Sequence, residues 1–193
     1  MTQHKLLTQC QFVHMPWKNG KGKTLELLRG EDKQGLIFRI SQATVAESGH
    51  FSDFTGLDRT LVLIKGKGMR LSHHSVDAAR HHDLVHLLDI ARFDGGDLTS
   101  SALIDGAIED LNIMVRAKDH KARVQAITAP CEALKKTDQV AYFYANEVCH
   151  IALDYAEKRL MMPKESFLIM AKSEGYGLRS GSGVLIVIQA RHE

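Results

Sequence analysis

Short apolar or alternating runs, separated by turn residues, follow one another along the whole 193-residue chain, and helical periodicity is scarce. Short runs with turn signals every ~8–12 positions are typical of a β-sandwich or a β-barrel. We therefore predict an all-β fold. The predicted strands cover residues 9–13, 24–28, 37–45, 59–64, 69–72, 84–90, 98–104, 108–115, 123–128, 140–144, 150–155, 166–171 and 184–190.

A weak internal repeat divides the chain into two parts. Residues 61–71 and 141–153 each read as a strand, a tight turn and a second strand. The charged segment 117–121 is the most plausible seam between them. We expect two small antiparallel β-barrels or jelly rolls packed as one body, over residues 1–120 and 121–193, and leave open whether they share strands.

Charge and cysteine usage exclude several classes of protein. The formal net charge is only +2, which gives no support to a nucleic-acid partner or an anionic membrane surface. The three cysteines, Cys10, Cys131 and Cys149, have no metal-ligand spacing and read as reduced side chains. No signal-peptide segment opens the sequence, and an apolar run such as 184–188 is far short of the ~20 residues that span a bilayer. We expect a soluble, cytoplasmic protein.

The segment around the only tryptophan is the first candidate for a binding site. Trp17 is followed by Lys18, Asn19 and Gly20, and a second glycine, Gly22, comes two positions later. Glycines let the backbone approach another group closely, while the three side chains offer an apolar wall, a cation and an amide. This inventory suits a small-molecule pocket. A surface hairpin with one packed tryptophan is the alternative.

Polar residues two or four positions apart share a face on three of the predicted strands. A one-sided sheet that turns its polar face to water is the alternative to a lined pocket. The polar sets are Thr24 with Glu26, Arg39 with Ser41, and Asn112 with Arg116. The intervening apolar residues that need burial include Phe38, Ile40, Leu111, Ile113 and Val115.

Three arginines would give such a pocket its chemistry. Arg39, Arg59 and Arg116 carry planar, permanently charged forks that match a carboxylate. Glu26 and Asp58 would then orient the arginines or contact an N–H of the ligand. A purely structural network of ion pairs is the alternative for part of this set.

The order of these motifs resembles the HutD/Ves family of bacterial cupin-like (RmlC-like) proteins. The matching pieces lie within residues 16–116, and the remainder matches only in its strand pattern. In order they are Trp17-Lys18-Asn19-Gly20-x-Gly22-x-Thr24-x-Glu26, Phe38-Arg39-Ile40-Ser41-x-Ala43-x-Val45, Gly49-x-Phe51-Ser52-x-Phe54-x-Gly56-x-Asp58-Arg59-x-Leu61, Leu63-x-x-Gly66-x-Gly68-x-x-Leu71 and Asp110-Leu111-Asn112-x-Met114-x-Arg116.

The resemblance implies a bicupin-like fold that has a ligand pocket and lacks the usual cupin metal. For the HutD branch it also implies an association with the regulation of histidine breakdown, and for the Ves branch a role in the response to stress and cold. Two positions depart from the family pattern. Phe38 stands where tryptophan is frequent, and residues 96–99 lack a proline that often follows the Gly-Asp pair.

The histidines do not read as a cupin metal site. His73 is adjacent to His74, and His81 to His82, so each pair points to opposite faces of a strand. The His-x-His spacing of a cupin site and its downstream glutamate are missing. We therefore expect no metal and no other cofactor. No nucleophile–base constellation is legible, so no catalytic residue is assigned.

We predict a metal-free bicupin that binds a small anionic metabolite of the urocanate or N-formylglutamate class, with a regulatory role in histidine utilisation or the stress response. A binding protein is favoured over an enzyme. The alternatives are a cupin-type isomerase or epimerase that moves a proton with His50 or Glu26, and a protein-interaction module. A homodimer remains open. The predicted ligand-binding residues are Trp17, Lys18, Asn19, Gly20, Thr24, Glu26, Arg39, Ser41, Ser52, Asp58, Arg59, Asn112 and Arg116.

Overall fold

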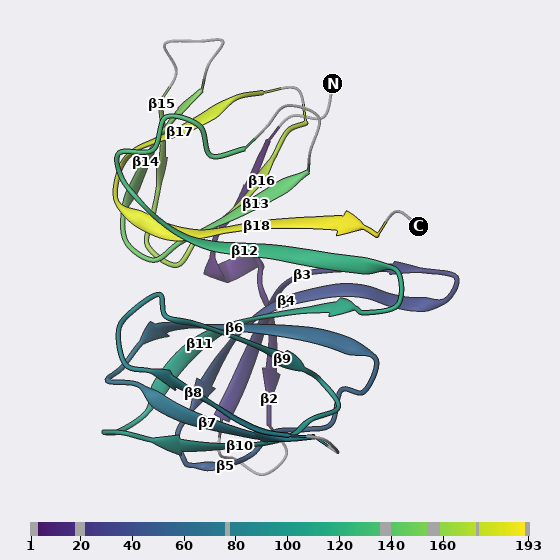
Figure 1. Cartoon of the computed structure of the whole chain (residues 1–193). Helices are drawn as coiled ribbons and strands as arrows, with labels where there is room; N and C mark the ends of the chain where they lie inside the picture. Colours follow the sequence, from purple (N-terminus) through teal and green to yellow (C-terminus); the bar gives the residue numbers. More distant parts are fainter. Residues whose placement is uncertain are drawn as a thin grey trace. The chain divides into compact units, whose positions relative to one another are not determined.

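The computed structural model describes residues 4–17, 22–75, 78–135, 140–153, 159–172 and 174–191 (Figure 1). Within these residues the strands pair antiparallel, and the helical structure is one 3₁₀ turn, η1 (Gln9–Gln11). The all-β fold class predicted from the sequence is confirmed. No helix in this part of the chain has the length and apolar character needed to cross a membrane.

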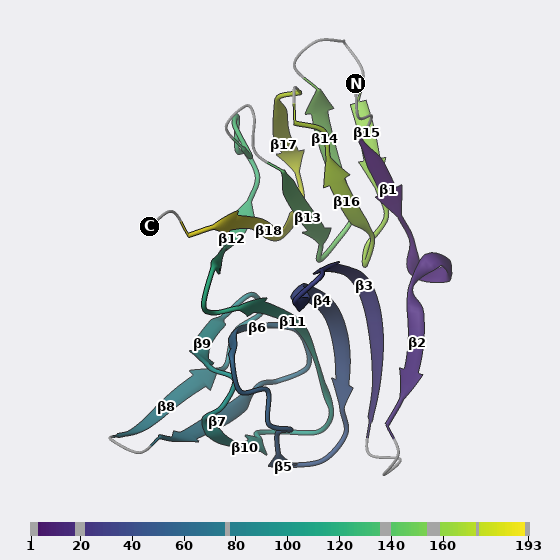
Figure 2. The same ribbon diagram turned by 90° about the vertical axis from the view of Figure 1, so that its right-hand side faces the viewer.

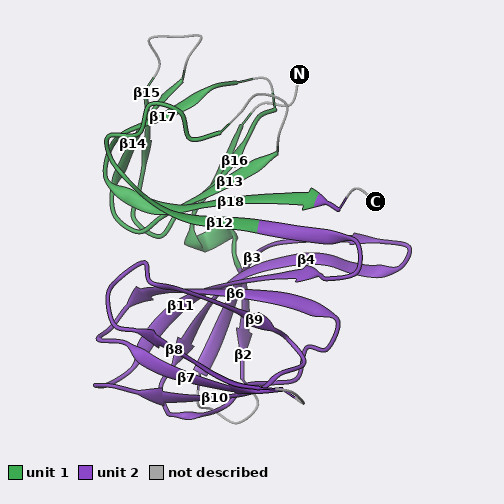
Figure 3. Cartoon of the chain, in the orientation of Figure 1, with its two compact units in different colours: residues 1–12, 123–189 green, residues 13–122, 190–193 purple. Residues whose placement is uncertain are grey.

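The chain separates into two compact units, which Figure 3 shows in different colours. Unit 1 contains residues 1–12 and 123–189, and unit 2 contains residues 13–122 and 190–193. The expected division assigned the start of the chain to the first half. In the structure, β1 (Lys5–Leu7) instead pairs with β16 (Phe167–Met170), so the first strand belongs to unit 1.

Unit 2 is built from two antiparallel sheets, which lie as two layers in Figure 1. The six-stranded sheet has the order β2 (Val13–Pro16), β3 (Gly22–Asp32), β4 (Gly35–Val45), β11 (Ile108–Arg116), β6 (Leu57–Lys65) and β9 (Ile90–Asp94). The four-stranded sheet has the order β5 (Gly49–His50), β10 (Leu98–Leu103), β7 (Met69–His74) and β8 (Ala79–Leu84). Among the described strands both sheets are open, so of the two expected forms, barrel or jelly roll, the structure matches the two-sheet jelly roll.

Apolar side chains from both sheets of unit 2 form its core. Leu61 and Leu63 of β6 belong to the same buried cluster as Met69 and Leu71 of β7 and Leu84 of β8. All five are at most 1% exposed. Burying side chains of this size contributes about 1.5–3 kcal/mol each, which makes this cluster a main source of stability for the unit.

Strands β4 and β11 form the centre of the six-stranded sheet, and both faces are buried over most of β11 and over residues 40–43 of β4. Ile40, Leu111 and Ile113 point to one face and have no exposed surface. Ser41 and Asn112 lie on the other face and are also buried, at 3% and 7% exposure. The expected burial is therefore found for Ile40, Leu111, Ile113 and Val115, whereas Phe38 is only partly buried, and Ser41 and Asn112 do not face water.

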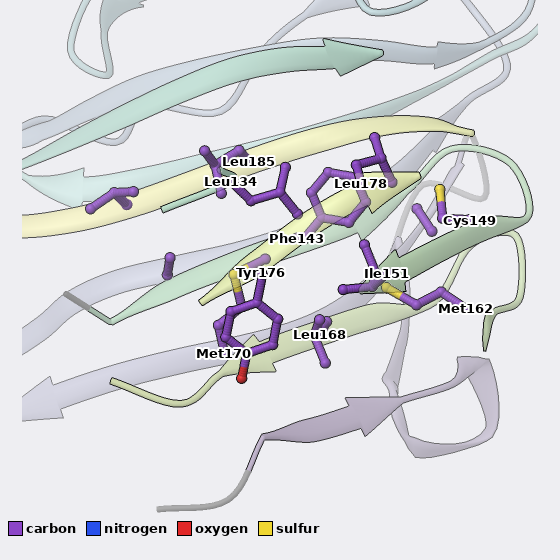
Figure 4. Close-up of a cluster of buried hydrophobic side chains, with 13 residues drawn as sticks. Leu134, Phe143, Cys149, Ile151, Met162, Leu168, Met170, Tyr176, Leu178 and Leu185 are labelled. Carbon is purple, nitrogen blue, oxygen red and sulfur yellow. The ribbon is translucent and has the colours of Figure 1, made fainter. Parts of the chain in front are cut away.

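Unit 1 is also an open antiparallel sandwich (Figure 2). Its core includes Phe143, Leu168, Tyr176 and Leu178, which Figure 4 labels. All four are at most 1% exposed. The larger sheet has the order β1, β16, β13 (Ala141–Ala145), β18 (Ser182–Ala190) and β12 (His120–Thr128). The smaller sheet has the order β15 (Arg159–Met162), β14 (Cys149–Leu153) and β17 (Tyr176–Ser180).

Two predicted strands are wrong. Residues 84–90 were expected as one strand, but β8 ends at Leu84 and β9 begins at Ile90. The Asp89 carboxylate accepts hydrogen bonds from the backbone N–H groups of Val85 and His86, both at 2.8 Å, and so holds a turn between them. Residues 9–13 contain η1 and only the first residue of β2. A local turn motif overrides the apolar pattern in both places.

Gly22 gives a test of how the start of β3 is packed. A methyl group added there would lie 2.8 Å from the Trp17 ring and closer still to the Thr44 carbonyl oxygen. We expect Gly22→Ala to reduce the free energy of unfolding by about 1–3 kcal/mol, measured by denaturant titration. Gly49→Ala is the control, since nothing lies within 4 Å of its added methyl group. Equal stability of the two variants would contradict this packing.

Candidate functional site

A cavity of ≈ 680 Å³ lies in unit 2 over the polar face of β4 and β11. This volume is in the range of small-molecule sites, about 300–1,000 Å³. Its wall is completed by the end of β2, by β10 and by the segment between β4 and β6. The lining residues are Met15, Pro16, Trp17, Thr24, Arg39, Ser41, Ala43, Val45, Glu47, Ser48, Gly49, His50, Phe51, Ser52, Phe54, Arg59, Ser101, Asp110, Asn112 and Met114.

The strand register arranges the polar side chains of the cavity floor in rows. Residues directly opposite each other on antiparallel strands project from the same face, with Cβ atoms about 4.5–5.5 Å apart. The three rows are Arg39–Met114–Arg59, Ser41–Asn112–Leu61 and Ala43–Asp110–Leu63. One row therefore holds two arginines, and the other two hold the amide and the carboxyl group of β11.

Trp17 closes one side of the cavity. Its indole Nε1–H donates a hydrogen bond of 2.8 Å to Thr24 Oγ1 on β3, and its backbone N–H donates to the Gly22 carbonyl at 3.0 Å. The absence of a side chain at Gly22 leaves room for the indole ring. The bond to Thr24, which sequence reasoning did not foresee, fixes the ring at the cavity wall.

Arg39 is held by a carboxylate at its inner end. Its Nε donates to Glu26 Oε2 at 2.7 Å, and its Nη2 lies 3.3 Å from the Met15 sulfur. Arg39 and Glu26 side chains are 18% and 10% exposed, so this ion pair is largely shielded from water. Glu26 therefore orients the guanidinium group, as the sequence suggested, and it is a buried neighbour of the cavity and not a lining residue.

Arg59 has a different environment, built from aromatic rings. The guanidinium carbon lies 5.0 Å from the ring centroid of Phe51, 5.1 Å from that of Phe54 and 5.0 Å from that of Phe93. The residue is only 4% exposed, and its Nε has no hydrogen-bond partner among the described residues. Burial lowers the pKa of Arg59 to about 10, so the side chain still carries its charge at neutral pH.

Asp110 and Asn112 share the sheet face of Arg59 on the cavity floor, with Asn112 one row and Asp110 two rows away from it. They are 1% and 7% exposed, and in each residue the Oδ1 atom is buried with no hydrogen-bond partner among the described residues. Burial raises the pKa of Asp110 to about 7, although the positive charge of Arg59 acts to lower it. The Asp110 carboxyl is thus close to half protonated at neutral pH.

The structure brings together most of the predicted ligand-binding set. Seven of those residues line the cavity, and Glu26 supports one of them. Lys18, Asn19 and Gly20 lie outside the described residues. The seven are Trp17, Thr24, Arg39, Ser41, Ser52, Arg59 and Asn112.

Asp58 and Arg116 were also predicted to bind the ligand, but they do not line the cavity. Asp58 precedes Arg59 on β6, so alternation turns it to the opposite face, where Arg191 Nη2 donates to its Oδ2 at 2.7 Å. Arg116 lies at the end of β11, where its guanidinium group binds the carboxylates of Asp32 and Asp119 at 2.7–2.9 Å. Hydrogen bonds from Arg116 lower the pKa of both aspartates. This part of the predicted set is a structural ion-pair network.

Sequence reasoning missed several lining residues. Asp110 was open to prediction, because it lies two positions before Asn112 and so shares its face. Phe51 and Phe54 belong to the segment between β4 and β6, where no periodic signal indicates which side chains turn inward. They were present in the family motif but were assigned no role.

A cupin-type metal site needs several histidine and carboxylate side chains gathered around one point. Among the described residues, no three His, Cys, Asp or Glu side chains gather in this way. The sequence argument rested on adjacent histidines, but two histidines from neighbouring strands do meet. The β7–β8 hairpin places His73 Nε2 3.0 Å from His82 Nδ1, and His73 Nδ1 lies 2.9 Å from Thr99 Oγ1. Burial lowers the pKa of His73 to about 4 and also lowers the pKa of the partly buried His82, which favours the neutral form of both rings.

The antiparallel sandwich with a polar cavity over one sheet defines a cupin-like protein. The family model described as HutD matches residues 9–185, and the chain belongs to this family. An uncharacterised 21.2 kDa protein in the hutC 3′ region of Pseudomonas putida is 34% identical over 155 residues, which cover 79% of this chain and 80% of that protein. Protein Ves of Escherichia fergusonii is 32% identical over 111 residues, 56% of each chain.

A solved structure agrees with this assignment. HutD from Pseudomonas fluorescens SBW25, described as the formate condition, superimposes with a TM-score of 0.80. The alignment covers 98% of this chain and 100% of that one at 25% sequence identity. The cupin-like fold and the HutD/Ves resemblance proposed from the sequence are therefore both confirmed.

The pKa of Asp110 predicts how stability depends on pH. In the unfolded chain the carboxyl loses its proton near its ordinary pKa of 3.8, whereas in the folded protein it does so near 7. The contribution of the protonated Asp110 carboxyl to the free energy of unfolding is thus fully present below about pH 4, and it is lost as the pH rises through 7. We expect Asp110→Asn, which stays neutral, to gain free energy of unfolding over wild type as the pH rises, by a few kcal/mol between about pH 4.5 and 8.

Thermal unfolding across this pH range measures the effect. Glu109→Gln is a matched control, because it removes a carboxylate from the neighbouring position of β11 that does not line the cavity and binds Lys65 and Gln42. A difference between Asp110→Asn and wild type that stays constant from pH 4.5 to 8 would contradict the buried, protonated state of Asp110.

Proposed function

We propose that the protein is a metal-free binding protein for a small organic carboxylate, held in the cavity of unit 2. The observation that carries this proposal is Arg59, a charged group buried in the cavity wall without a hydrogen-bonded carboxylate among the described residues. A ligand carboxylate would supply the missing counter-charge at that position.

The energetics of Arg59 support a ligand as its partner. Removing a guanidinium group from water costs several kcal/mol unless an opposite charge or hydrogen bonds replace the lost hydration. Three aromatic rings contribute about 0.5–2 kcal/mol each through cation–π attraction, which offsets only part of that cost. An apolar side chain of similar size at this position would give the protein equal or greater stability. The buried charge is therefore better explained by a role in binding an anion.

Arg39 supplies the second positive group of the site. It lies in the same row as Arg59, across Met114 of β11, and its guanidinium group faces the cavity while Glu26 fixes its Nε. Glu26 accepts from Nε and the Met15 sulfur lies near Nη2, so Nη1 is the group that remains available for an anion. Two guanidinium groups flanking one space suit a carboxylate better than a neutral ligand.

Family membership extends the proposal to a biological role. The chain belongs to the HutD family, and a relative is described by its place beside hutC. We propose that ligand binding has a regulatory role in histidine utilisation, with urocanate or an N-formylglutamate-type compound as the anion and the cytoplasm as the location. A role in the stress response, suggested by the resemblance to protein Ves, is the second branch of this proposal.

One observation favours a second candidate, a cupin-type isomerase or epimerase. Asp110 lines the cavity and has a pKa of about 7, which suits a group that both takes up and releases a proton at neutral pH. Exchange of ligand C–H protons with deuterated solvent, followed by NMR, detects that activity. Loss of the exchange in Asp110→Asn would assign it to this carboxyl.

Arg59→Met tests the binding proposal directly. A thermal-shift screen with urocanate, N-formylglutamate and simple carboxylates first identifies a ligand, whose affinity calorimetry then measures. We expect the variant to bind at least about 30-fold more weakly, because it loses the buried charge that faces the ligand. Its unfolding temperature should not fall, since no ion pair is broken and an uncompensated buried charge is removed. Arg70→Met, on the surface of β7, is the control.

The second test separates the two roles of Arg39. Arg39→Ala, Glu26→Gln and the double variant are compared for ligand affinity and unfolding temperature. If Arg39 binds the ligand, Arg39→Ala loses affinity by about 30-fold or more with a modest loss of stability. A purely structural pair would instead give large stability losses in both single variants, partly recovered in the double variant, with affinity unchanged.

A further inference from the structure

Two methionines line the cavity, and solvent reaches one of them. Met15 lies on β2, which is the edge strand of the six-stranded sheet and pairs with β3, and its side chain is 42% exposed. Met114, in the middle of the cavity floor, is only 3% exposed. A dissolved oxidant therefore reaches the Met15 sulfur without any opening of the sheet, whereas Met114 is shielded.

The Met15 sulfur contacts a charged group of the proposed binding site. It lies 3.3 Å from Nη2 of Arg39, whose Nε is already bound to Glu26. A thioether sulfur is a weak hydrogen-bond acceptor, so this contact satisfies Nη2 poorly. The Arg39 side chain is 18% exposed, so water replaces only part of the missing hydrogen bonding. A stronger acceptor in place of the sulfur would therefore bind Arg39 more firmly.

Oxidation of Met15 by hydrogen peroxide creates such an acceptor. The sulfur attacks one oxygen of the peroxide, the O–O bond breaks and an S–O bond forms, and the proton of the new S–OH group passes to the departing hydroxide to give water. Sulfur loses two electrons to the peroxide, and sulfoxide reductases return the product, methionine sulfoxide, to methionine. The sulfoxide oxygen lies one bond beyond the sulfur. Rotation about the three side-chain bonds of this exposed residue lets the oxygen turn toward Nη2.

Building on the proposed function, we propose that Met15 is a site of reversible oxidation whose sulfoxide oxygen binds Arg39 and weakens the affinity of the cavity for an anion. A hydrogen bond from a charged donor is about twice as strong as one between neutral groups. The sulfoxide oxygen carries a partial negative charge, so it competes with an anion for the guanidinium group and repels an anion at the neighbouring Nη1. Peroxide thus lowers the affinity for the ligand without unfolding the protein.

The first experiment tests the reaction and the contact without any ligand. Met161, in unit 1, is 60% exposed, so Met161→Leu serves as the parent protein and leaves Met15 as the exposed methionine of the described residues. After treatment with hydrogen peroxide, peptide mass spectrometry should find oxygen added to Met15 and not to Met114. A second parent also carries Glu26→Gln and Arg39→Gln, which remove the guanidinium group together with its carboxylate. We expect oxidation to lower the unfolding temperature by about 2–4 °C more in this second parent, where the sulfoxide has lost its donor.

The second experiment measures the effect on the cavity, by calorimetry with urocanate as the probe. The oxidised protein should bind urocanate about 10-fold more weakly, and methionine sulfoxide reductase should restore the affinity. Met15→Gln carries an amide oxygen at this position permanently, and it should show a similar loss before any peroxide is added. Met15→Leu cannot be oxidised there, so its affinity should be the same before and after peroxide. Any effect that arises from the exposed Cys10 would persist in Met15→Leu.

Three results would overturn the inference. They are a Met15 that reacts no faster than Met114, an equal change of unfolding temperature with and without Arg39, and an unchanged affinity for urocanate after oxidation. If urocanate does not bind the reduced protein, the urocanate branch of the proposed function fails, and the temperature difference still decides whether the sulfoxide binds Arg39.

Discussion

The pairing of β4 with β11 is the constraint on which unit 2 depends. These strands lie at the centre of the six-stranded sheet, and their register decides which side chains share a face. One face carries Ile40, Leu111 and Ile113, which have no exposed surface. The other face forms the cavity floor. A slip of one residue in this register would exchange the two sets and place arginine and aspartate among apolar side chains.

The cavity floor shows how one sheet can hold both a core and a polar site. Along β6, Leu61 and Leu63 share the face of Arg59 and join the apolar core with β7 and β8. Arg59 lies at the polar end of that face. Phe93, whose ring contacts its guanidinium group, belongs to the apolar core, and Phe51 packs against this core. The aromatic rings thus serve as a boundary between the dry core and the ligand space, and as a partial substitute for water around the guanidinium group.

The alternation of side chains along each strand could be predicted from the sequence. It indicated that Arg39 and Ser41 share a face with each other, and that Ile40 lies on the opposite one, and the structure agrees. It could not reveal cross-strand partners. The bond between His73 and His82 depends on the register of a hairpin, and the pairs of Arg116 depend on a turn at the end of β11. For the same reason the aromatic cage of Arg59 was invisible, since its members come from a connecting segment and from β9.

The discontinuity of unit 1 has a consequence for how the chain is made. Residues 13–122 form nearly all of unit 2 as one continuous stretch, so its sheets contain only strands that emerge early from the ribosome. Strand β1 emerges before all of them, yet its partner β16 lies more than 150 residues later. During synthesis β1 therefore has no strand partner until β16, close to the end of the chain, has been made. Vectorial folding would complete the ligand-binding unit first and leave the N-terminal strand as one of the last pieces to be added.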